Sequence, residues 1–283
     1  MRLLILLVCL TPLSSFASRT VTDELGRKVV VPDHPHRLVC LIPSVVDDVY
    51  ALGAGSDVVA VSDFTKYPAA ASAKPSIGLP SSPSLEMILS LHPDLVLGSG
   101  DSHGIQIVDQ LQQYGIPVFM VDPHGIAGIY KSLHSLGMVL DRESSANDLI
   151  DRLHSRERAV RERAQGKPVV HIFMPIWYDP VMTIGKHAFI TELIEAAGGQ
   201  SVTSDISQEW PQVSLETIIA RAPDAILLVK GSKMSLKDLS TRPGWSSLEA
   251  VRMRHIDYVD NKIDFPSPVA FDAMEELAKQ FYP

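Results

Sequence analysis

The sequence predicts an α/β protein made of two similar lobes joined by a long helix. Short apolar strands alternate with helices in both halves of the 283-residue chain, as in parallel sheets that helices cover on both faces. The phrase SLEMILSLHPDLVL (84–97) returns as SLETIIARAPDAIL (214–227), which indicates two related halves. Between the halves, residues 126–164 carry only a sparse apolar stripe, which favours a long helix with one buried side.

The composition is that of a globular protein with material for two cores. Apolar residues make up 46% of the chain and charged residues 20%, and the net charge is −8. Basic residues in 156–163 alternate with glutamates, which is typical of a solvated helix face. We therefore expect no nucleic-acid partner. Separately, we expect the protein to be a monomer.

The N-terminus has the three regions of a secretory signal peptide. Arg2 precedes an apolar run over 3–10, and small residues lead to Ala17, so we predict a signal peptide over 1–17 and export to the periplasm. The run is too short to span a bilayer. The alternative is a lipid anchor on Cys9, but this cysteine lies too early and in the middle of the apolar run.

The N-terminal lobe is expected over 18–124. It begins with a small hairpin at 20–31, and the single cysteine of the exported chain, Cys40, is expected in a buried strand. The later elements are strand LVCLI (38–42), helix VVDDVYALG (45–53), strand VVAVS (58–62), helix SLEMILSL (84–91), strand LVLG (95–98), helix IQIVDQLQQYG (105–115) and strand VFMVD (118–122).

A linking helical segment (125–166) leads to the C-terminal lobe (167–283). Both lobes are expected to be Rossmann-like, with mainly parallel sheets, and a crevice is expected at the carboxyl ends of the strands of each lobe. The elements of the second lobe are strand VVHIFM (169–174), helix 187–197, helix SLETIIARA (214–222), strand AILLV (225–229), strand IDYVD (256–260) and helix 268–281.

Each copy of the repeated phrase supplies an N-cap serine, a first-turn glutamate and two adjacent apolar residues that we expect to face the sheet. These residues are Ser84, Glu86, Ile88 and Leu89 in the first copy, and Ser214, Glu216, Ile218 and Ile219 in the second. Helices of such layers begin at the carboxyl edge of the sheet, so one glutamate should stand at the cleft rim of each lobe.

Six phrases, spread in order over the whole exported chain, carry a family resemblance. They are TVTDELGRKVVVP, RLVCLIPS, LGAGSDVVAVSDFTKYP, SLE…HPDLVL, WPQVSLE…APDAILL and RPGWSSLEAVR. With them the chain resembles the periplasmic substrate-binding proteins of ABC importers, in the branch that serves cobalamin, ferric siderophores and haem. It is most similar to the cobalamin-binding members over WPQVSLETIIARAPDAILL.

The resemblance implies a non-enzymatic receptor without a cofactor, which captures cobalamin or a related corrinoid and delivers it to an ABC importer permease. It implies that the linking helix is rigid and that a largely preformed ligand cleft lies between the two lobes. It also implies that Glu86 and Glu216 dock on arginines of the permease. A ferric siderophore or haem is the alternative ligand within the same branch.

Residues that follow strand ends are the candidates for binding the ligand. Tyr67 and Trp210 match aromatic positions that contact ligand in cobalamin-binding members, and Phe64 is expected in the core. Two positions depart from those members: Gly78–Pro80 replaces a tryptophan, and Phe265 replaces an arginine. The full candidate set is Ser44, Phe64, Tyr67, Asp101, His103, His124, Trp177, Tyr178, Trp210 and Phe265.

Two further functions compete with this interpretation. His103 and His124 follow neighbouring strands and could bind zinc or manganese, but such a site needs further ligands, including a carboxylate, so we predict no metal site. GDSHG (100–104) matches the nucleophile elbow of serine hydrolases, with Ser102 as the nucleophile. The catalytic partners of Ser102 would be Asp141 with His187 or His255. However, the preceding strand ends near Leu97, several residues before Ser102, and no oxyanion motif precedes GDSHG. We therefore predict no catalytic residue.

Overall fold

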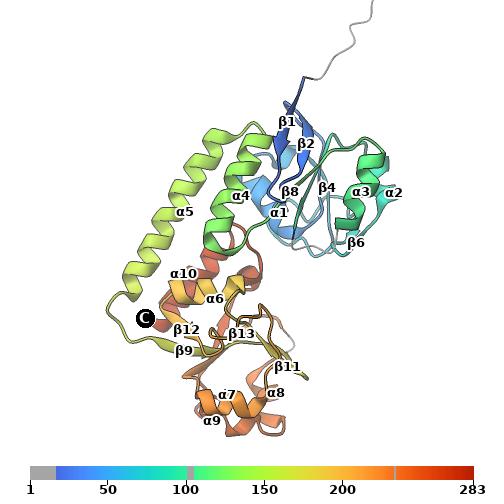
Figure 1. The fold of residues 1–283 in the computed structure, drawn as a ribbon. Helices are drawn as coiled ribbons and strands as arrows, with labels where there is room; N and C mark the ends of the chain where they lie inside the picture. Colours follow the sequence, from blue (N-terminus) through green and yellow to red (C-terminus); the bar gives the residue numbers. More distant parts are fainter. Residues whose placement is uncertain (1–16, 101–104, 233) are drawn as a thin grey trace, which may run out of the picture.

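The computed structural model describes residues 17–100, 105–232 and 234–283, and it contains two four-stranded parallel sheets (Figure 1). One sheet has the order β4-β3-β7-β8 and the other the order β12-β9-β13-β14. In both, the strand that comes first in the chain lies between the second and the third. The two lobes therefore share one topology, and the predicted fold class is confirmed.

The N-terminal lobe begins with a hairpin of β1 and β2, as predicted, in which Val21 pairs with Val29. The short hairpin of β5 and β6 is an addition to the predicted elements. The bounds are β1 (Ser18–Thr22), β2 (Lys28–Pro32), β3 (Leu38–Cys40), α1 (Pro43–Ala51), η1 (Gly55–Asp57), β4 (Val58–Val61), β5 (Gly78–Leu79), β6 (Ser82–Pro83), α2 (Leu85–Ser90), β7 (Leu95–Ser99), α3 (Ile105–Gln113) and β8 (Val118–Val121).

The C-terminal lobe contains all the predicted strands and helices, together with a hairpin of β10 and β11, the edge strand β12, and the short helices α8 and α9. The bounds are β9 (Val170–Phe173), β10 (Pro175–Tyr178), β11 (Val181–Thr183), α6 (Phe189–Ala196), β12 (Gly199–Ser201), α7 (Leu215–Arg221), β13 (Ala225–Val229), α8 (Leu236–Thr241), η2 (Trp245–Ser247), α9 (Glu249–Arg252), β14 (Ile256–Val259), η3 (Asn261–Asp264) and α10 (Ala270–Phe281).

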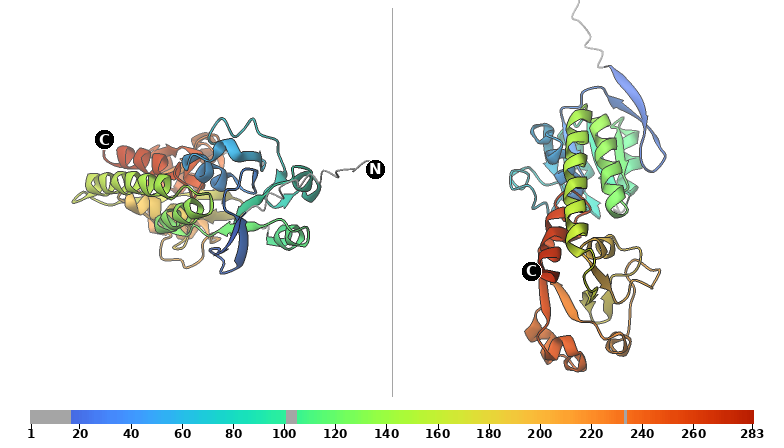
Figure 2. Two further views of the ribbon diagram at one scale, coloured as in Figure 1. Left: turned by 90° about the horizontal axis from the view of Figure 1, so that it is seen from above. Right: turned by 90° about the vertical axis from the view of Figure 1, so that its left-hand side faces the viewer.

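The single helix expected over 126–164 is wrong, because the segment forms two helices, α4 (Gly125–Val139) and α5 (Glu143–Ala164). The chain turns at Asp141, which has a left-handed φ of 57°. Gly137 lets α4 approach α5 closely, since a Cβ there would lie 2.6 Å from the Ala146 Cβ. The predicted apolar stripe belongs to α5, which has 22 residues and runs alongside both lobes (Figure 2).

One buried apolar cluster passes through both lobes and through the helices between them. It joins Val46 of α1 and Phe119 of β8 to Leu133 of α4, Leu153 of α5 and Leu277 of α10. Each sheet has a second cluster on its other face, under α2 and α3 in the first lobe and under α7 to α9 in the second. The lobes are thus packed on a shared core, which accounts for the rigid connection implied by the resemblance.

Two helix N-termini are capped by carboxylates from the opposite lobe. The Val269 N–H, just before α10, donates to Asp47 Oδ2 of α1 at 3.1 Å. The Ile126 N–H of α4 donates to Glu192 Oε2 of α6 at 2.8 Å. Gly125 has a φ of +67°, and any Cβ there would collide with the Glu192 carboxylate. Negative charge at a helix N-terminus is favourable, so each lobe stabilises a helix of the other.

The serines and aspartates of the repeated phrase have the same roles in both copies. Ser84 and Ser214 accept hydrogen bonds from the backbone N–H three residues later, at 3.2 Å each, so both predicted N-caps are confirmed. The Asp94 carboxylate accepts from the N–H of Arg37 at 3.0 Å, beside β3. Asp224 accepts from the N–H of His171 in β9 at 2.8 Å. Each aspartate therefore fastens its strand to the neighbouring strand.

The expected burial of two adjacent apolar residues per copy is correct for only one of them. Ile88 and Ile218 are fully buried, whereas Leu89 is half-buried and Ile219 is 37% exposed. Successive residues of a helix point about 100° apart, so a short surface helix turns only one of two neighbours squarely towards the sheet. Among the described residues, no helix is both long and apolar enough to cross a membrane.

Ile218→Ala is expected to lower the free energy of unfolding by about 3 kcal/mol, because it leaves a cavity under α7. The neighbouring control, Ile219→Ala, should cost less than about 1 kcal/mol, since this side chain is partly in water. Urea denaturation followed by circular dichroism measures both. Equal losses would contradict the orientation of α7.

Candidate functional site

An interlobe cleft of about 710 Å³ lies at the carboxyl ends of both sheets. This volume is in the range of small-molecule sites, and the position is the one expected for parallel α/β layers. The residues that line it are Ile42, Pro43, Ser44, Phe64, Leu79, Pro80, Ser81, Ser99, Pro123, His124 and Gly125 from the first lobe and the start of α4, and His187, Phe189, Ile190, Glu209, Trp210, Asp264, Phe265 and Pro266 from the second.

Four predicted ligand residues line the interlobe cleft. Ser44 lies in the first turn of α1, directly after β3, and His124 precedes α4 after β8. Trp210, which is 42% exposed, and Phe265 come from the second lobe. The rule that placed candidates after strand ends therefore found residues from both walls.

The expectation that Phe64 lies in the core is wrong. Its side chain is 67% exposed, lines the interlobe cleft and follows β4. Its backbone has a φ of 65°, a left-handed conformation that is unfavourable for a bulky side chain. An exposed aromatic ring held in a strained conformation at a cavity wall points to a role in binding.

Tyr67 bridges the lobes at the edge of the interlobe cleft and is not part of its lining. The Asn261 amide donates to the Tyr67 hydroxyl at 2.9 Å, and this hydroxyl donates to Asp260 Oδ1 at 3.2 Å. Its ring meets Phe265 edge-on, with ring centroids 6.0 Å apart. Tyr67 thus supports a residue of the cleft wall and ties the first lobe to η3.

Trp177 and Tyr178 lie outside the lining, on the hairpin of β10 and β11. Their rings stack on each other, with centroids 5.5 Å apart. The Arg242 guanidinium covers the Tyr178 ring at 3.3 Å from its centroid, and Trp177 Nε1 donates to the Asp179 carbonyl at 2.8 Å. These two predicted ligand residues form a surface stack of their own.

The histidines of the interlobe cleft do not form a metal site with other described residues. His124 Nε2 lies 3.1 Å from Asp122 Oδ1, and His187 lines the second lobe. Within the described part of the chain, no group of three or more histidine, cysteine, aspartate or glutamate side chains is placed to hold a metal ion. Asp101 and His103 lie outside the described residues.

Two carboxyl groups of the second lobe, Glu209 and Asp264, line the interlobe cleft. The Asp264 side chain is open to the water of the cleft, yet protein from both lobes surrounds it. This desolvation raises the pKa of the Asp264 carboxyl to about 6, and the Lys66 ammonium opposes the shift. Asp264 is therefore a cleft carboxyl whose charge changes at a pH well above the usual aspartate range.

The three partners nominated for a Ser102 nucleophile do not come together. Asp141 lies at the turn between α4 and α5, where its carboxylate is 2.9 Å from His34 Nδ1. His255 precedes β14, at the amino end of the sheet, whereas His187 is in the interlobe cleft at the carboxyl ends. Ser102 itself lies outside the described residues.

Sequence reasoning missed several lining residues. The hairpin of β5 and β6 contributes Leu79, Pro80 and Ser81. Glu209 and Asp264 each precede a predicted aromatic residue, so extending the strand-end rule by one residue would have found both.

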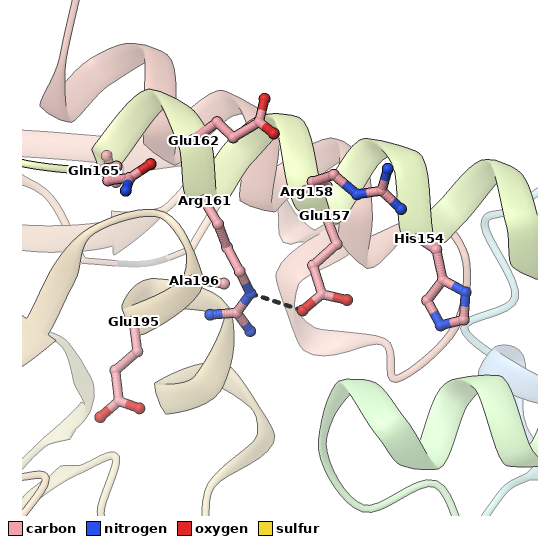
Figure 3. A pocket seen from close by; sticks show the side chains of 9 residues that line it. His154, Glu157, Arg158, Arg161, Glu162, Gln165, Glu195 and Ala196 are labelled. Carbon is pink, nitrogen blue, oxygen red and sulfur yellow. Dashed lines mark hydrogen bonds and ion pairs between the residues drawn. The ribbon is translucent and has the colours of Figure 1, made fainter.

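A second hollow, of about 620 Å³, lies on the surface between α5 and α6 (Figure 3). Charged side chains of α5 border it, and they are partly paired among themselves. Arg161 Nε donates to Glu157 Oε1 at 2.8 Å, and Glu157 Oε2 accepts from the Tyr130 hydroxyl at 2.7 Å. None of the predicted ligand residues that the structure describes borders this hollow. The interlobe cleft is therefore the better candidate for the ligand site.

The fold and the interlobe cleft define a two-lobed α/β binding protein. Residues 38–263 match the family described as "Periplasmic binding protein", and the chain belongs to this family. It is a binding protein of the ABC-importer type, in the branch whose members bind vitamin B12, haem or siderophores.

Three proteins illustrate what the chain is similar to. "Uncharacterized ABC transporter substrate-binding lipoprotein YvrC" of Bacillus subtilis (strain 168) is 30% identical over 272 residues, which cover 93% of this chain and 85% of that protein. "Vitamin B12-binding protein" of Yersinia pestis (strain Pestoides F) is 28% identical over 204 residues and 72% of each chain. The apo structure of the periplasmic heme-binding protein RhuT from Roseiflexus sp. RS-1 has a TM-score of 0.81 and 25% identity, and the match covers 87% of this chain and 98% of that one.

Asp264→Asn is expected to stabilise the protein at neutral pH relative to the unchanged chain. The folded pKa lies above the ordinary value of 3.8, so the unchanged protein loses stability as the pH rises from that value through about 6. The asparagine variant lacks this loss. Urea denaturation at about pH 4 and about pH 7.5 should show the variant gaining on the unchanged protein at the higher pH.

The matched control is Asp148→Asn, on the exposed side of α5. A carboxyl resonance of Asp264 that titrates at or below the ordinary aspartate value in a carbon-13 NMR experiment would contradict the assignment.

Proposed function

We propose that this protein captures cobalamin or a related corrinoid in the periplasm and delivers it to the permease of an ABC importer. The observation that carries the proposal is the interlobe cleft at the carboxyl ends of both sheets. The similarity to a vitamin B12-binding protein, which extends over 72% of both chains, supports this ligand.

The aromatic side chains of the interlobe cleft suit a broad, flat ligand. Phe64 comes from the first lobe, and Phe189, Trp210 and Phe265 come from the second. Aromatic rings bury a large area at a small cost in side-chain entropy, so they are effective against the face of a macrocycle. The shared core of the lobes favours a cleft that is largely preformed and closes only slightly.

Haem is the second candidate ligand, because the heme-binding RhuT matches nearly the whole fold. A flat macrocycle of this kind would use the same aromatic walls, and His124 or His187 could approach its metal. The corrinoid is preferred here on the sequence similarity, and ligand titration separates the two.

Glu86 and Glu216 are proposed as the docking contacts for the permease. Both side chains are exposed, and each lies in the first turn of a short helix, α2 or α7, in equivalent positions of the two lobes. A roughly two-fold permease with basic residues at its outer surface would meet one carboxylate from each lobe. This gives the repeated phrase a functional reason in addition to its structural one.

Export by a signal peptide over 1–17 remains our proposal for localisation, with a lipid anchor on Cys9 as the alternative. The lipoprotein description of YvrC favours testing both. We likewise propose domain boundaries at 18–124, 125–166 and 167–283, with α4 and α5 forming the middle segment.

Isothermal titration of the chain from Ser18 onward with cyanocobalamin is expected to show saturable one-to-one binding. Trp210→Ala should weaken the affinity by about tenfold or more, because it removes a large ring from the cleft wall. Trp177→Ala is the matched control, since this exposed tryptophan lies outside the lining, and its affinity should be unchanged. Absence of heat with cyanocobalamin, together with binding of haemin, would replace the corrinoid by haem.

The double variant Glu86→Ala, Glu216→Ala is expected to reduce binding to proteoliposomes that carry a vitamin B12 permease, by at least about tenfold. Cyanocobalamin affinity should stay unchanged, because neither glutamate lines the interlobe cleft. Glu143→Ala, at an exposed first-turn glutamate of α5, is the control. Undiminished binding of the double variant would refute the docking assignment.

A further inference from the structure

The charged and titratable groups of the interlobe cleft are unevenly distributed. Glu209 and Asp264 provide two carboxyl groups, and His124 and His187 provide two imidazoles. Among the described residues, no lysine or arginine lines the interlobe cleft. The described lining therefore offers a ligand carboxyl groups and apolar rings, and it contains no lysine or arginine that could neutralise a carboxylate of the ligand.

Basic side chains close to this wall are engaged elsewhere. Lys262, two residues before Asp264, turns away to α10, where its Nζ lies 2.6 Å from Asp272 Oδ2. Arg242 lies over the ring of Tyr178. Lys66 Nζ donates to the Asn261 amide oxygen at 3.2 Å; it opposes the raised pKa of Asp264 and is not part of the lining. None of these three basic residues therefore lines the cavity beside Asp264.

The environment of Asp264 strengthens its effect on a ligand. Phe265 and Pro266 follow it directly, and all three line the interlobe cleft. In a partly desolvated site the interaction between charges is several times stronger than in water. A carboxylate of the ligand in this place would be repelled, whereas an amide N–H or an ammonium group would find an acceptor.

We infer that the interlobe cleft selects metal chelates without net negative charge, and that Asp264 determines this selectivity. The preferred ligands are electroneutral or cationic chelates that present amide or ammonium donors to the second lobe. Haem, with its propionates, and ferric catecholates, which are polyanionic, are disfavoured. This inference rests on the proposed function as a chelate-binding protein, and it restricts which members of the branch's ligand classes fit.

The test uses two pairs of probes whose members differ in charge, and the cobalamin pair is also close to identical in shape. One pair is cyanocobalamin and its monocarboxylic acid, in which one side-chain amide is hydrolysed. The other is ferrioxamine B, a cationic ferric hydroxamate with a free amine, and its N-succinyl derivative, which carries a carboxylate instead. The chain from Ser18 onward is titrated with each probe at neutral pH. In every pair for which binding is detected, the uncharged or cationic member should bind with an affinity at least about tenfold higher than the acidic member.

Asp264→Asn should reduce that ratio several-fold by improving the affinity of the acidic member. Asp148→Asn, on the exposed side of α5, should leave the ratio unchanged. An unchanged ratio in Asp264→Asn would show that Asp264 does not determine the selectivity. Equal affinities within a pair, or a preference for the acidic member, would overturn the charge rule itself.

The outcomes also separate this inference from the proposed corrinoid function. If ferrioxamine B binds in preference to its succinyl derivative and cyanocobalamin does not bind, the corrinoid proposal fails and the charge rule stands. If cyanocobalamin and its acid bind equally, the corrinoid proposal stands and the charge rule fails. If none of the four probes binds, both are overturned.

Discussion

The structure depends on one continuous apolar core that passes from the first sheet, through α4 and α5, to the second sheet. Because Leu133 and Leu153 of the connecting helices are buried in the same cluster as residues of both sheets, the lobes cannot rotate freely about a linker. The carboxyl ends of the two sheets are thereby held facing each other. The interlobe cleft is a consequence of this packing.

Polar contacts between the lobes lie close to the cleft that they help to shape. Glu192 caps α4 next to Gly125, which itself lines the interlobe cleft. Tyr67 contacts the start of η3, the short helix that ends at Asp264 and is followed by Phe265. A ligand that touches these lining residues therefore contacts the same segments that hold the lobes together.

The cleft walls combine aromatic rings with carboxyl groups. Apolar and aromatic lining is general among small-molecule sites, and here Phe64, Phe189, Trp210 and Phe265 supply the rings. Asp264 directly precedes Phe265, so the second lobe presents a carboxyl group beside an aromatic ring in the same wall.

The sequence by itself determined the strands, the repeated capped helices with Ser84 and Ser214, and the two-lobed class, because periodicity and caps are local properties of the chain. The order of the strands within each sheet came only from the tertiary structure. Only the tertiary structure decided that Trp210 enters the interlobe cleft while Trp177 stacks on Tyr178 outside it, that Phe64 is exposed, and that 126–164 is two helices. Periodicity and caps are set within one segment, whereas the burial of a particular side chain and the neighbours it meets depend on contacts between segments distant in sequence.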